Sequence, residues 1–424
     1  MLQPEVVRPA ASEQANAGGR WVVLGAASLL QAFFTLLQQG ITILAPFFLA
    51  AFRLSLTQVG LLVGCFSAGL ALTALPTGVV VDRIGIRRSL VLSASAISLA
   101  VVGALALQRS VVAVGACLFL AGLLGGAPNI ASGKAVFGAF PARQRGMAMG
   151  LRQIAVPAGA GAAALLLPLL GRTFGWQAPL GLAALLEIAG AALFLLLLRE
   201  QIGQAIATPP GGNLWRELAA IARDRNLALI AGTTLLLVMT QYVMLAYLIL
   251  YLTSLRYSTI QASAALLLVQ LGAVFGRWAW GWVSDRLFRG GRRPVIAIVT
   301  VCSALAIGAL AASRSGESLA IIDVQAFAIG FTCISWNALT VTMIAEVAGV
   351  SRAGSAMGLN AAAAFGGGIV APPLFGSIVD VSHSYHVGFI AMSLVTMAAL
   401  VPLAQVRERS GQTSRTLVFD AAGK

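Results

Sequence analysis

Long apolar runs, separated by short polar segments, dominate the chain. Twelve of these runs reach about 20 residues, the length at which an α-helix crosses a hydrocarbon core of roughly 30 Å. They lie at approximately 21–48, 56–80, 88–107, 110–138, 147–170, 176–198, 226–253, 259–283, 294–312, 318–347, 354–378 and 386–405. The pattern predicts an all-α membrane protein with twelve transmembrane helices.

One connection between the runs, residues 199–225, is much longer than the others. It contains the turn-rich sequence Thr208-Pro209-Pro210-Gly211-Gly212 and then a stretch, 214–218, that we expect to form a short interfacial helix. The predicted organisation is a disordered N-terminus (1–20), a first six-helix bundle (21–198), this linker (199–225), a second six-helix bundle (226–406) and a tail (407–424).

The composition agrees with a membrane protein. Hydrophobic residues make up 59% of the chain and charged residues only 10%, which excludes a disordered chain or a disulfide-stapled mini-protein and disfavours an ordinary soluble enzyme. The four cysteines lie inside apolar runs, where they are small hydrophobic residues.

The basic residues predict the orientation of the chain. The net charge is +14, and with the N-terminus in the cytoplasm 20 Lys and Arg residues fall on the cytoplasmic side against five on the outer side. Because positive residues accumulate on the cytoplasmic side of membrane proteins, we expect a multi-pass inner-membrane protein with both termini in the cytoplasm. The positive charge therefore requires no nucleic acid partner.

The two halves of the chain repeat each other. Residue pairs at offsets of 203 and 208 form an ordered series: Gln38 and Gln241, Gly69 and Gly272, Gly78 and Gly281, Asp82 and Asp285, Arg83 and Arg286, Gly122 and Gly330, and Asn129 and Asn337. Such a series predicts two pseudo-symmetric six-helix bundles that arose by duplication, an arrangement common in transporters.

A motif between the second and third runs carries a family resemblance. The sequence from Gly78 through Asp82 and Arg83 to Arg88 resembles the loop signature of the major facilitator superfamily, and Gly281-Trp282-Val283-Ser284-Asp285-Arg286 is similar to its degenerate second copy. The resemblance implies the major facilitator fold, with two bundles that rock about a central site and open it alternately to each side. It also implies a gating role for Gly78, Asp82, Arg83, Gly281, Asp285 and Arg286.

The resemblance gives the two aspartates specific partners. A carboxylate stabilises the positive N-terminal end of a facing helix. In the family, the partner of the residue at Asp82 is the start of the eleventh helix, here residues 354–358. By pseudo-symmetry Asp285 would face residues 146–150, so both contacts would close the cytoplasmic side.

Arg277 is a charge within an otherwise apolar helix. It precedes Asp285 by eight residues, or roughly 12 Å of helix, and a charge at that depth normally faces a cavity or a partner. The segment from Gly276 to Arg286 resembles the eighth helix of the oxalate/formate and monocarboxylate branches, where the equivalent arginine holds the substrate anion. The basic partners of those relatives are replaced here by Gln38, Gln39 and Asn360. The alternative is an arginine that pairs with a helix carboxylate for structure.

Other polar residues at similar depth complete a predicted binding site. Arg152 is a second anion ligand or a part of the cytoplasmic gate, and Lys134 belongs to that gate or extends to the membrane surface. The neutral candidates for contact with the substrate or for helix–helix hydrogen bonds are Gln38, Gln241, Tyr242, Asn129, Asn337, Trp336 and Asn360.

Two acidic residues lie deep in the runs, Asp323 in the tenth and Glu187 in the sixth. A carboxyl group in a low-dielectric medium exchanges its proton within the working range of pH, as proton coupling requires. Asp323 is the preferred proton-coupling residue, because the tenth helix usually lines the cavity in the family. Glu187 is the second candidate, and a structural role is the alternative for both.

These observations favour a secondary transporter that moves a small organic anion, a carboxylate, together with protons. A drug/proton efflux antiporter is an alternative, although Val156-Pro157-Ala158-Gly159-Ala160-Gly161 matches the fifth-helix pattern of that group only in part. A transporter of inorganic anions such as nitrate or cyanate and a membrane sensor also stay open. We expect no enzymatic activity, no cofactor and no metal, with His383 and His386 in an exposed loop. The expected partners are the anionic substrate, protons and the lipid bilayer, and the chain is expected to be a monomer.

Overall fold

The computed structural model describes residues 11–140, 145–197, 223–348 and 353–407. Within these ranges the chain is helical and contains no strand. Twelve helical segments are long and apolar enough to cross a membrane, and each coincides with one of the twelve predicted runs. The all-α fold class with twelve spans is therefore confirmed.

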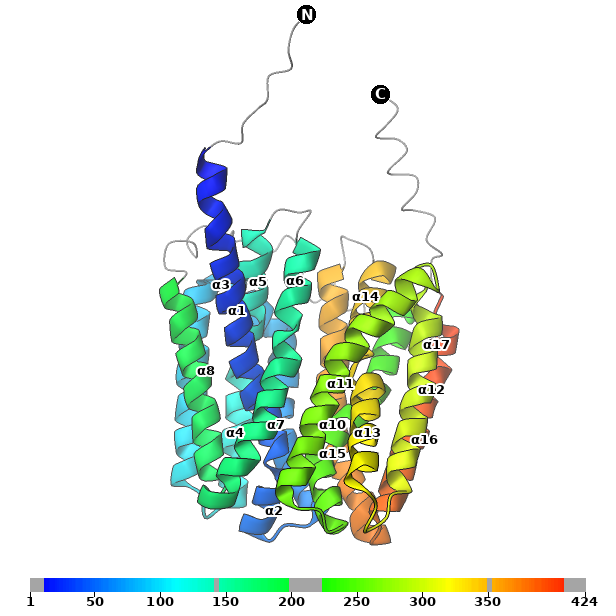
Figure 1. The fold of residues 1–424 in the computed structure, drawn as a ribbon. Helices are drawn as coiled ribbons and strands as arrows, with labels where there is room; N and C mark the ends of the chain where they lie inside the picture. The colour runs from blue at the N-terminus through cyan, green and yellow to red at the C-terminus, as the bar shows by residue number, and fades with distance from the viewer. Residues whose placement is uncertain (1–10, 141–144, 198–222, 349–352, 408–424) are drawn as a thin grey trace, which may run out of the picture.

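The helices form two groups that stand side by side (Figure 1). The first group contains α1 (Ala11–Ile43), α2 (Ala45–Phe52), α3 (Leu56–Ala106), α4 (Val111–Leu124), α5 (Ala127–Ala139), α6 (Arg145–Gln153), α7 (Ala155–Phe174) and α8 (Gln177–Leu197). The second contains α10 (Arg225–Ser254), α11 (Thr259–Arg286), α12 (Arg292–Ala311), α13 (Leu319–Ile329), the π-helical turn η3 (Gly330–Ile334), α14 (Asn337–Ala348), α15 (Ala353–Ser382), α16 (Tyr385–Ala398) and α17 (Leu400–Gln405).

The described part of α1 begins at the same end of the molecule at which α17 ends (Figure 1). An even number of spans requires this arrangement. We call this end the cytoplasmic end, following the charge prediction, and the opposite end the outer end.

Two boundaries differ from the sequence prediction. The helix α1 begins at Ala11, although residues 1–20 were expected to be disordered; alanine, glutamate and glutamine at 11–17 favour a helix. The second and third spans follow each other directly within α3 and are separated only at Gly85, whose φ of 84° and ψ of 159° break the helix. Glycine adopts such a φ without a steric penalty. The chain therefore turns at the signature motif through this one residue, without a loop of several residues. The predicted interfacial helix at 214–218 lies outside the described residues.

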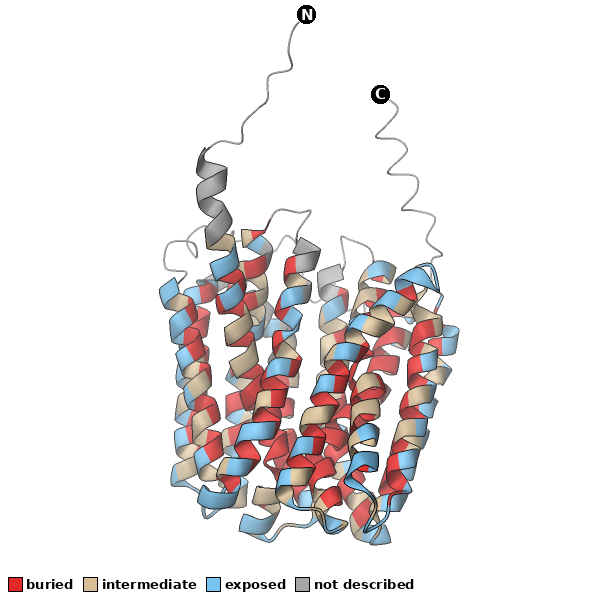
Figure 2. Ribbon diagram, viewed as in Figure 1, coloured by how far each residue is buried: buried red, intermediate tan, exposed pale blue. Residues whose placement is uncertain are grey.

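Exposed residues lie on the outward faces of the helices and buried residues lie between the helices (Figure 2). Large apolar side chains face outward on many helices; Leu99 is 73% exposed, Trp278 74% and Val381 83%. Such residues are stable on the surface only where hydrocarbon replaces water. The helix α10 is the most enclosed of the described spans, and it is buried along most of its length.

Repeat-related glycines form the tightest contacts within each bundle. A methyl group on Gly69 would overlap the carbonyl oxygen of Phe119 in α4, and one on Gly122 would overlap the carbonyl oxygen of Phe66 in α3. The second bundle reproduces this crossing, since Gly272 of α11 meets Phe327 and Gly330 meets the backbone of Val269. Small residues allow helix backbones to approach closely in membranes. The duplication predicted from the sequence is thus visible as the same helix crossing in both bundles.

This crossing predicts a clear difference between two glycine substitutions. Gly272→Ala places a methyl group against the carbonyl oxygen of Phe327 and should reduce the free energy of unfolding by about 1–3 kcal/mol. Gly308→Ala, in α12, meets open space and should be neutral or stabilise the helix by about 0.5–1 kcal/mol. Thermal unfolding of the purified protein in lipid nanodiscs measures both effects. Equal melting temperatures for the two variants would contradict the proposed crossing.

Candidate functional site

The helix α11 presents three different faces. Phe275, Trp278 and Trp282 are exposed on the lipid side. On the packed side, Gly276 contacts Phe331 and Ser335, and the indole N–H of Trp280 donates a 2.8 Å hydrogen bond to the carbonyl oxygen of Phe331. A third face carries Gln270 and, seven residues later, Arg277. Residues seven apart lie on the same side of a helix, so these two polar side chains share one face.

The face with Arg277 is directed toward the first bundle. A methyl group on Gly161 of α7 would lie 3.3 Å from the side chain of Leu267 and 3.6 Å from that of Gln270. The two bundles therefore meet at Gln270, and Arg277 lies two helical turns closer to the cytoplasmic end. A Cβ atom on Gly281, one further turn along, would have no atom within 4 Å.

The guanidinium of Arg277 has no acidic partner. The side chain is half-buried, and among the described residues it makes no ion pair and no hydrogen bond. A cation in a membrane helix is normally paired with an anion or a carbonyl group. Arg277 is thus a cation without an anionic partner among the described residues, on the helix face that also carries Gln270.

Arg152 is placed differently, inside the first bundle. It is only 3% exposed, and its guanidinium donates hydrogen bonds to Gln31 Oε1 (2.6 Å), Asn129 Oδ1 (2.8 Å) and Ser132 Oγ (2.8 Å). The carbonyl oxygen of Asn129 accepts a further bond of 2.7 Å. These acceptors come from α1 and α5, so Arg152 joins α6 to two neighbouring helices and its donors are occupied.

Two of the neutral candidates meet across the bundle boundary. Tyr242 of α10 interacts through its hydroxyl with the side chains of Gln38 in α1 and Ser67 in α3. Its ring lies against Gly368 of α15, where a methyl group would approach to 2.7 Å. Gln241, the next residue, is 9% exposed, and its Oε1 has no hydrogen-bond partner. The predicted residues Gln38 and Tyr242 therefore form one polar cluster with Ser67, which the sequence did not single out.

Three other candidates are engaged within the second bundle. Asn360 accepts a 2.6 Å hydrogen bond from Thr234 Oγ1 and is 4% exposed. Trp336 is completely buried, and its indole N–H donates to the carbonyl oxygen of Cys333 at 2.6 Å. Asn337 is half-buried, and its backbone carbonyl accepts a bond from Thr340. The packing of Trp336 and Asn360 holds helices together in this conformation and leaves little side-chain surface for a solute.

The two buried acids have unlike surroundings. Asp323 is half-buried in the outer part of α13, one residue before the strongly exposed Val324. Glu187 of α8 is completely buried, and neither of its carboxyl oxygens has a hydrogen-bond partner. Burial of an ionised carboxylate without a donor is unfavourable, so Glu187 lies in a site that disfavours its charged form.

The predicted gating residues are described only in the second half. Asp285 is exposed and forms a 2.7 Å ion pair with Arg292, which also contacts Glu346 at 3.3 Å. Arg286, at the end of the same helix, is exposed. The placements of Gly78 and of the Asp82 and Arg83 side chains lie outside the described part of the structure, so the latch at the cytoplasmic end stays a prediction.

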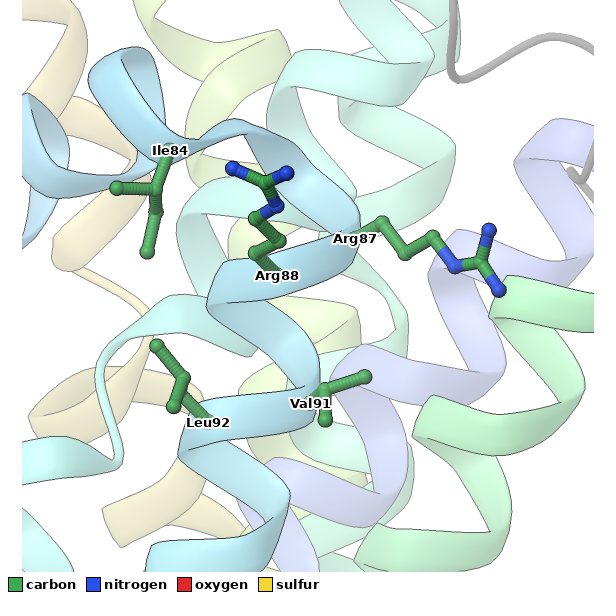
Figure 3. Close-up of a pocket in the computed structure, with 5 residues that line it drawn as sticks. All are labelled: Ile84, Arg87, Arg88, Val91 and Leu92. Atoms are coloured by element: carbon green, nitrogen blue, oxygen red, sulfur yellow. The ribbon is translucent and has the colours of Figure 1, made fainter.

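A shallow hollow lies beside α3 in the first bundle (Figure 3). It has a volume of about 490 Å³ and is lined by residues at the start of the second half of α3: Ile84, Arg87, Arg88, Val91 and Leu92. Arg87 and Arg88 are exposed there, at the cytoplasmic end of the span. Their position agrees with the accumulation of positive charge at a membrane surface and does not join the face of Arg277.

The described residues contain no group of three potential metal ligands. His386, one of the two histidines, uses its Nδ1 in a 2.7 Å hydrogen bond with the carbonyl oxygen of Ala311. The arrangement that stands out chemically is therefore an unpaired guanidinium and a neutral polar cluster between two helical bundles.

Comparisons with known proteins agree with this architecture. The sequence profile of the Major Facilitator Superfamily matches residues 27–341. An uncharacterised transporter of this type from Mycobacterium tuberculosis, Rv2994, is 31% identical over 401 residues, which cover 92% of this chain and 86% of the relative. The hexuronate transporter of Bacillus subtilis is 25% identical, with coverage of 89% and 93%. The crystal structure of the nucleoside transporter NupG superimposes with a TM-score of 0.74 at 14% identity, over 90% of this chain and 98% of that one.

The hydrogen bonds of Arg152 predict a role in stability. Arg152→Met leaves the acceptors on Gln31, Asn129 and Ser132 without their donor, and should reduce the free energy of unfolding by about 3 kcal/mol. Arg172→Met, in the same bundle, changes an exposed arginine and should alter stability by less than about 0.5 kcal/mol. Thermal unfolding in nanodiscs distinguishes the two. An Arg152 variant as stable as the Arg172 variant would show that the hydrogen bonds contribute nothing.

Proposed function

The chain belongs to the Major Facilitator Superfamily, and we propose that this secondary transporter carries a small organic anion with a carboxylate group. Transport would proceed by alternating access in the inner membrane, with both termini in the cytoplasm, a monomer as the working unit and protons as the coupling ion. The transporter family and the membrane location of the chain follow from the comparisons and the twelve spans. The anion, the protons and the orientation are the proposal.

The unpaired guanidinium of Arg277 is the observation that carries the anion assignment. A charge at the centre of a bilayer costs at least about 2.5–3.5 kcal/mol, and the described residues supply no carboxylate to offset it. A solute of opposite charge would offset that cost each time it binds. The planar guanidinium donates two parallel hydrogen bonds to a carboxylate, which favours that group over a spherical anion.

The neutral cluster of Gln38, Ser67 and Tyr242 supports a solute with further polar groups. An amide and two hydroxyls both donate and accept hydrogen bonds, as hydroxyl groups on a small carboxylate would require. The similarity to a relative named as a hexuronate transporter, over most of both chains, points in the same direction because a hexuronate carries a carboxylate and several hydroxyls.

The buried carboxyl of Glu187 supports proton coupling in the first bundle. Its complete enclosure without a donor favours the protonated form in this conformation, whereas the half-buried Asp323 lies toward the outer end. A coupling carboxyl must change its environment during the cycle, so that it releases the proton when water or a cation reaches it. We therefore prefer Glu187 over Asp323 as the proton carrier, the reverse of the order that the sequence suggested.

The anion assignment predicts selective stabilisation by carboxylates. In a screen of monocarboxylates, hexuronates, nitrate and lipophilic cations, a carboxylate at 100 times its Kd should stabilise the purified protein by about 2.7 kcal/mol. Arg277→Gln should weaken that binding by about 100-fold, since a charged hydrogen-bonded pair is lost, while folding is retained. Arg109→Gln, an exposed arginine at the outer end of the same molecule, is the matched control and should bind normally.

Other outcomes of this screen would redirect the assignment. Stabilisation by lipophilic cations alone would favour a drug/proton antiporter, and stabilisation by nitrate alone would favour an inorganic anion. Carboxylate binding that is unchanged in Arg277→Gln would refute the role of this residue.

The proposed proton carrier is tested in proteoliposomes with a carboxylate identified by the screen. Glu187→Gln should still exchange labelled solute across the membrane. It should no longer accumulate the solute under an imposed pH gradient, because an amide cannot bind and release a proton as a carboxyl group does. Asp323→Asn should retain both activities. If the Asp323 variant loses accumulation and the Glu187 variant keeps it, the proton belongs to Asp323.

A further inference from the structure

The outer ends of α3 and α15 are joined by a carboxylate that crosses the bundle boundary. Asp380, in the last turn of α15, accepts hydrogen bonds from the backbone N–H of Leu56 (3.0 Å) and Thr57 (2.8 Å). The Thr57 hydroxyl donates a third bond of 2.6 Å. Leu56 and Thr57 belong to the first bundle and Asp380 to the second, so these bonds hold the two bundles together.

These two amides have no partner within their own bundle. A helix leaves its first four N–H groups without intrahelical acceptors. In α3 the Ser55 hydroxyl accepts from the N–H of Gln58, and the side-chain oxygen of Gln58 accepts from the N–H of Ser55. The remaining N–H groups are those of Leu56 and Thr57, and Asp380 supplies both acceptors. The negative carboxylate also lies at the positive end of the helix, where it is most favourable.

The surrounding backbone fits this contact closely. A methyl group on Gly60 would lie 2.5 Å from the backbone of Pro372, and one on Gly376 would overlap the carbonyl oxygen of Leu56. The Tyr247 hydroxyl of α10 lies within hydrogen-bond distance of the carbonyl oxygens of Leu56 (2.8 Å) and Pro372 (2.7 Å). The seam is therefore closed by direct contact between α3, α10 and α15 and leaves no room for a wider side chain.

We infer that Asp380 is a gating residue, an outer latch that must release before the transporter can open at its outer end. The helices that it joins are the second and eleventh spans, the same pair that the predicted Asp82 latch would join at the cytoplasmic end. Asp380 caps α3 from the C-terminal end of α15, and in the predicted Asp82 latch these two helices would exchange roles. Because the bundles move as rigid bodies, separation at one end accompanies approach at the other, and the two caps form in turn.

Among the described residues, α3 and α15 have this latch and the pseudo-symmetric pair of helices does not. The pseudo-symmetric pair is α7 and α11, and the last turn of α7 carries Arg172, not an acid. A cation near the positive start of α11 would not stabilise it. The contact between α7 and α11 is instead made through Gly161 and apolar or neutral side chains. The inference concerns the transport cycle of the family and holds whichever solute is carried.

Hydrogen–deuterium exchange of the full-length protein in nanodiscs tests the latch. Asp380→Asn should raise exchange about tenfold at the start of α3 and also at the remote outer seam around Gly161 and Leu267. At the same time exchange should fall at the cytoplasmic ends of α6 and α14. Both changes follow if the population shifts toward an outward-open state. Glu317→Gln is the matched control and should leave the pattern unchanged, because Glu317 lies at the outer end and its hydrogen bonds are to Tyr257 and Arg314 of its own bundle.

Two milder variants test the same contact in case Asp380→Asn fails to fold. Thr57→Val removes one of three bonds, and Tyr247→Phe removes the bridging hydroxyl but keeps the ring packed on Phe375. Each should shift exchange in the same direction by about threefold. A change confined to the first turn of α3 would mean that Asp380 only caps that helix, and it would overturn the latch, as would an unchanged pattern in all three variants.

Discussion

In hydrocarbon a polar group that lacks a partner within the protein cannot form a hydrogen bond with water instead. This constraint distinguishes the polar residues that stabilise the fold from those proposed to function in transport. Arg152 satisfies it within one bundle, through neutral acceptors on two neighbouring helices. The first amides of α3 satisfy it only through Asp380 of the other bundle. Arg277 has no acidic partner in the described structure. Partners within a bundle make it rigid, partners between bundles hold one conformation, and the missing partner of Arg277 is the basis of the proposed anion site.

The same constraint separates rigid from movable contacts. Within the bundles, α3 crosses α4 and α11 crosses η3 at glycines whose backbones leave no space for a methyl group. These crossings are apolar and need no exchange of partners, so each bundle can move as a unit. Between the bundles, α3 and α15 also meet closely at Gly60 and Gly376, but this contact includes charge-assisted hydrogen bonds, which water can replace once the helices separate. Motion is therefore expected at the second kind of contact.

Much of the fold could be predicted because it depends on local properties of the sequence. Span length and apolar character identified the twelve helices, and the repeat identified the two bundles. Gly85 shows the limit of that approach, since a single residue with positive φ replaced the expected loop. The start of α1 at Ala11 was not predicted, because the apolar run begins only at residue 21 and the helix extends beyond it into polar residues.

The candidate site was less predictable because it depends on which side chains face each other. Arg152 and Arg277 looked alike in sequence, yet one has its donors occupied and the other does not. Trp336 was a reasonable binding residue by type, but its indole N–H donates a hydrogen bond to the carbonyl oxygen of Cys333 in the same span. Asp380 gave no signal, since an acid at the end of an apolar run is indistinguishable from an ordinary loop residue. Only the position of Leu56 and Thr57, more than 320 residues earlier in the chain, gives it a role.

The placement of the charges bears on how solute and proton would be coupled. The unpaired cation is in the second bundle, on α11, whereas the enclosed acid Glu187 is in the first, on α8. Under the proposed function the anion and the proton would therefore occupy different rigid bodies. They would influence each other through the bundle boundary, where Tyr242 meets Gln38. A solute held at Arg277 that also contacts Gln38 or Tyr242 draws the bundles together on that side, and the accompanying motion changes the surroundings of α8. Coupling then requires no direct contact between anion and proton, only that both favour the same arrangement of the bundles.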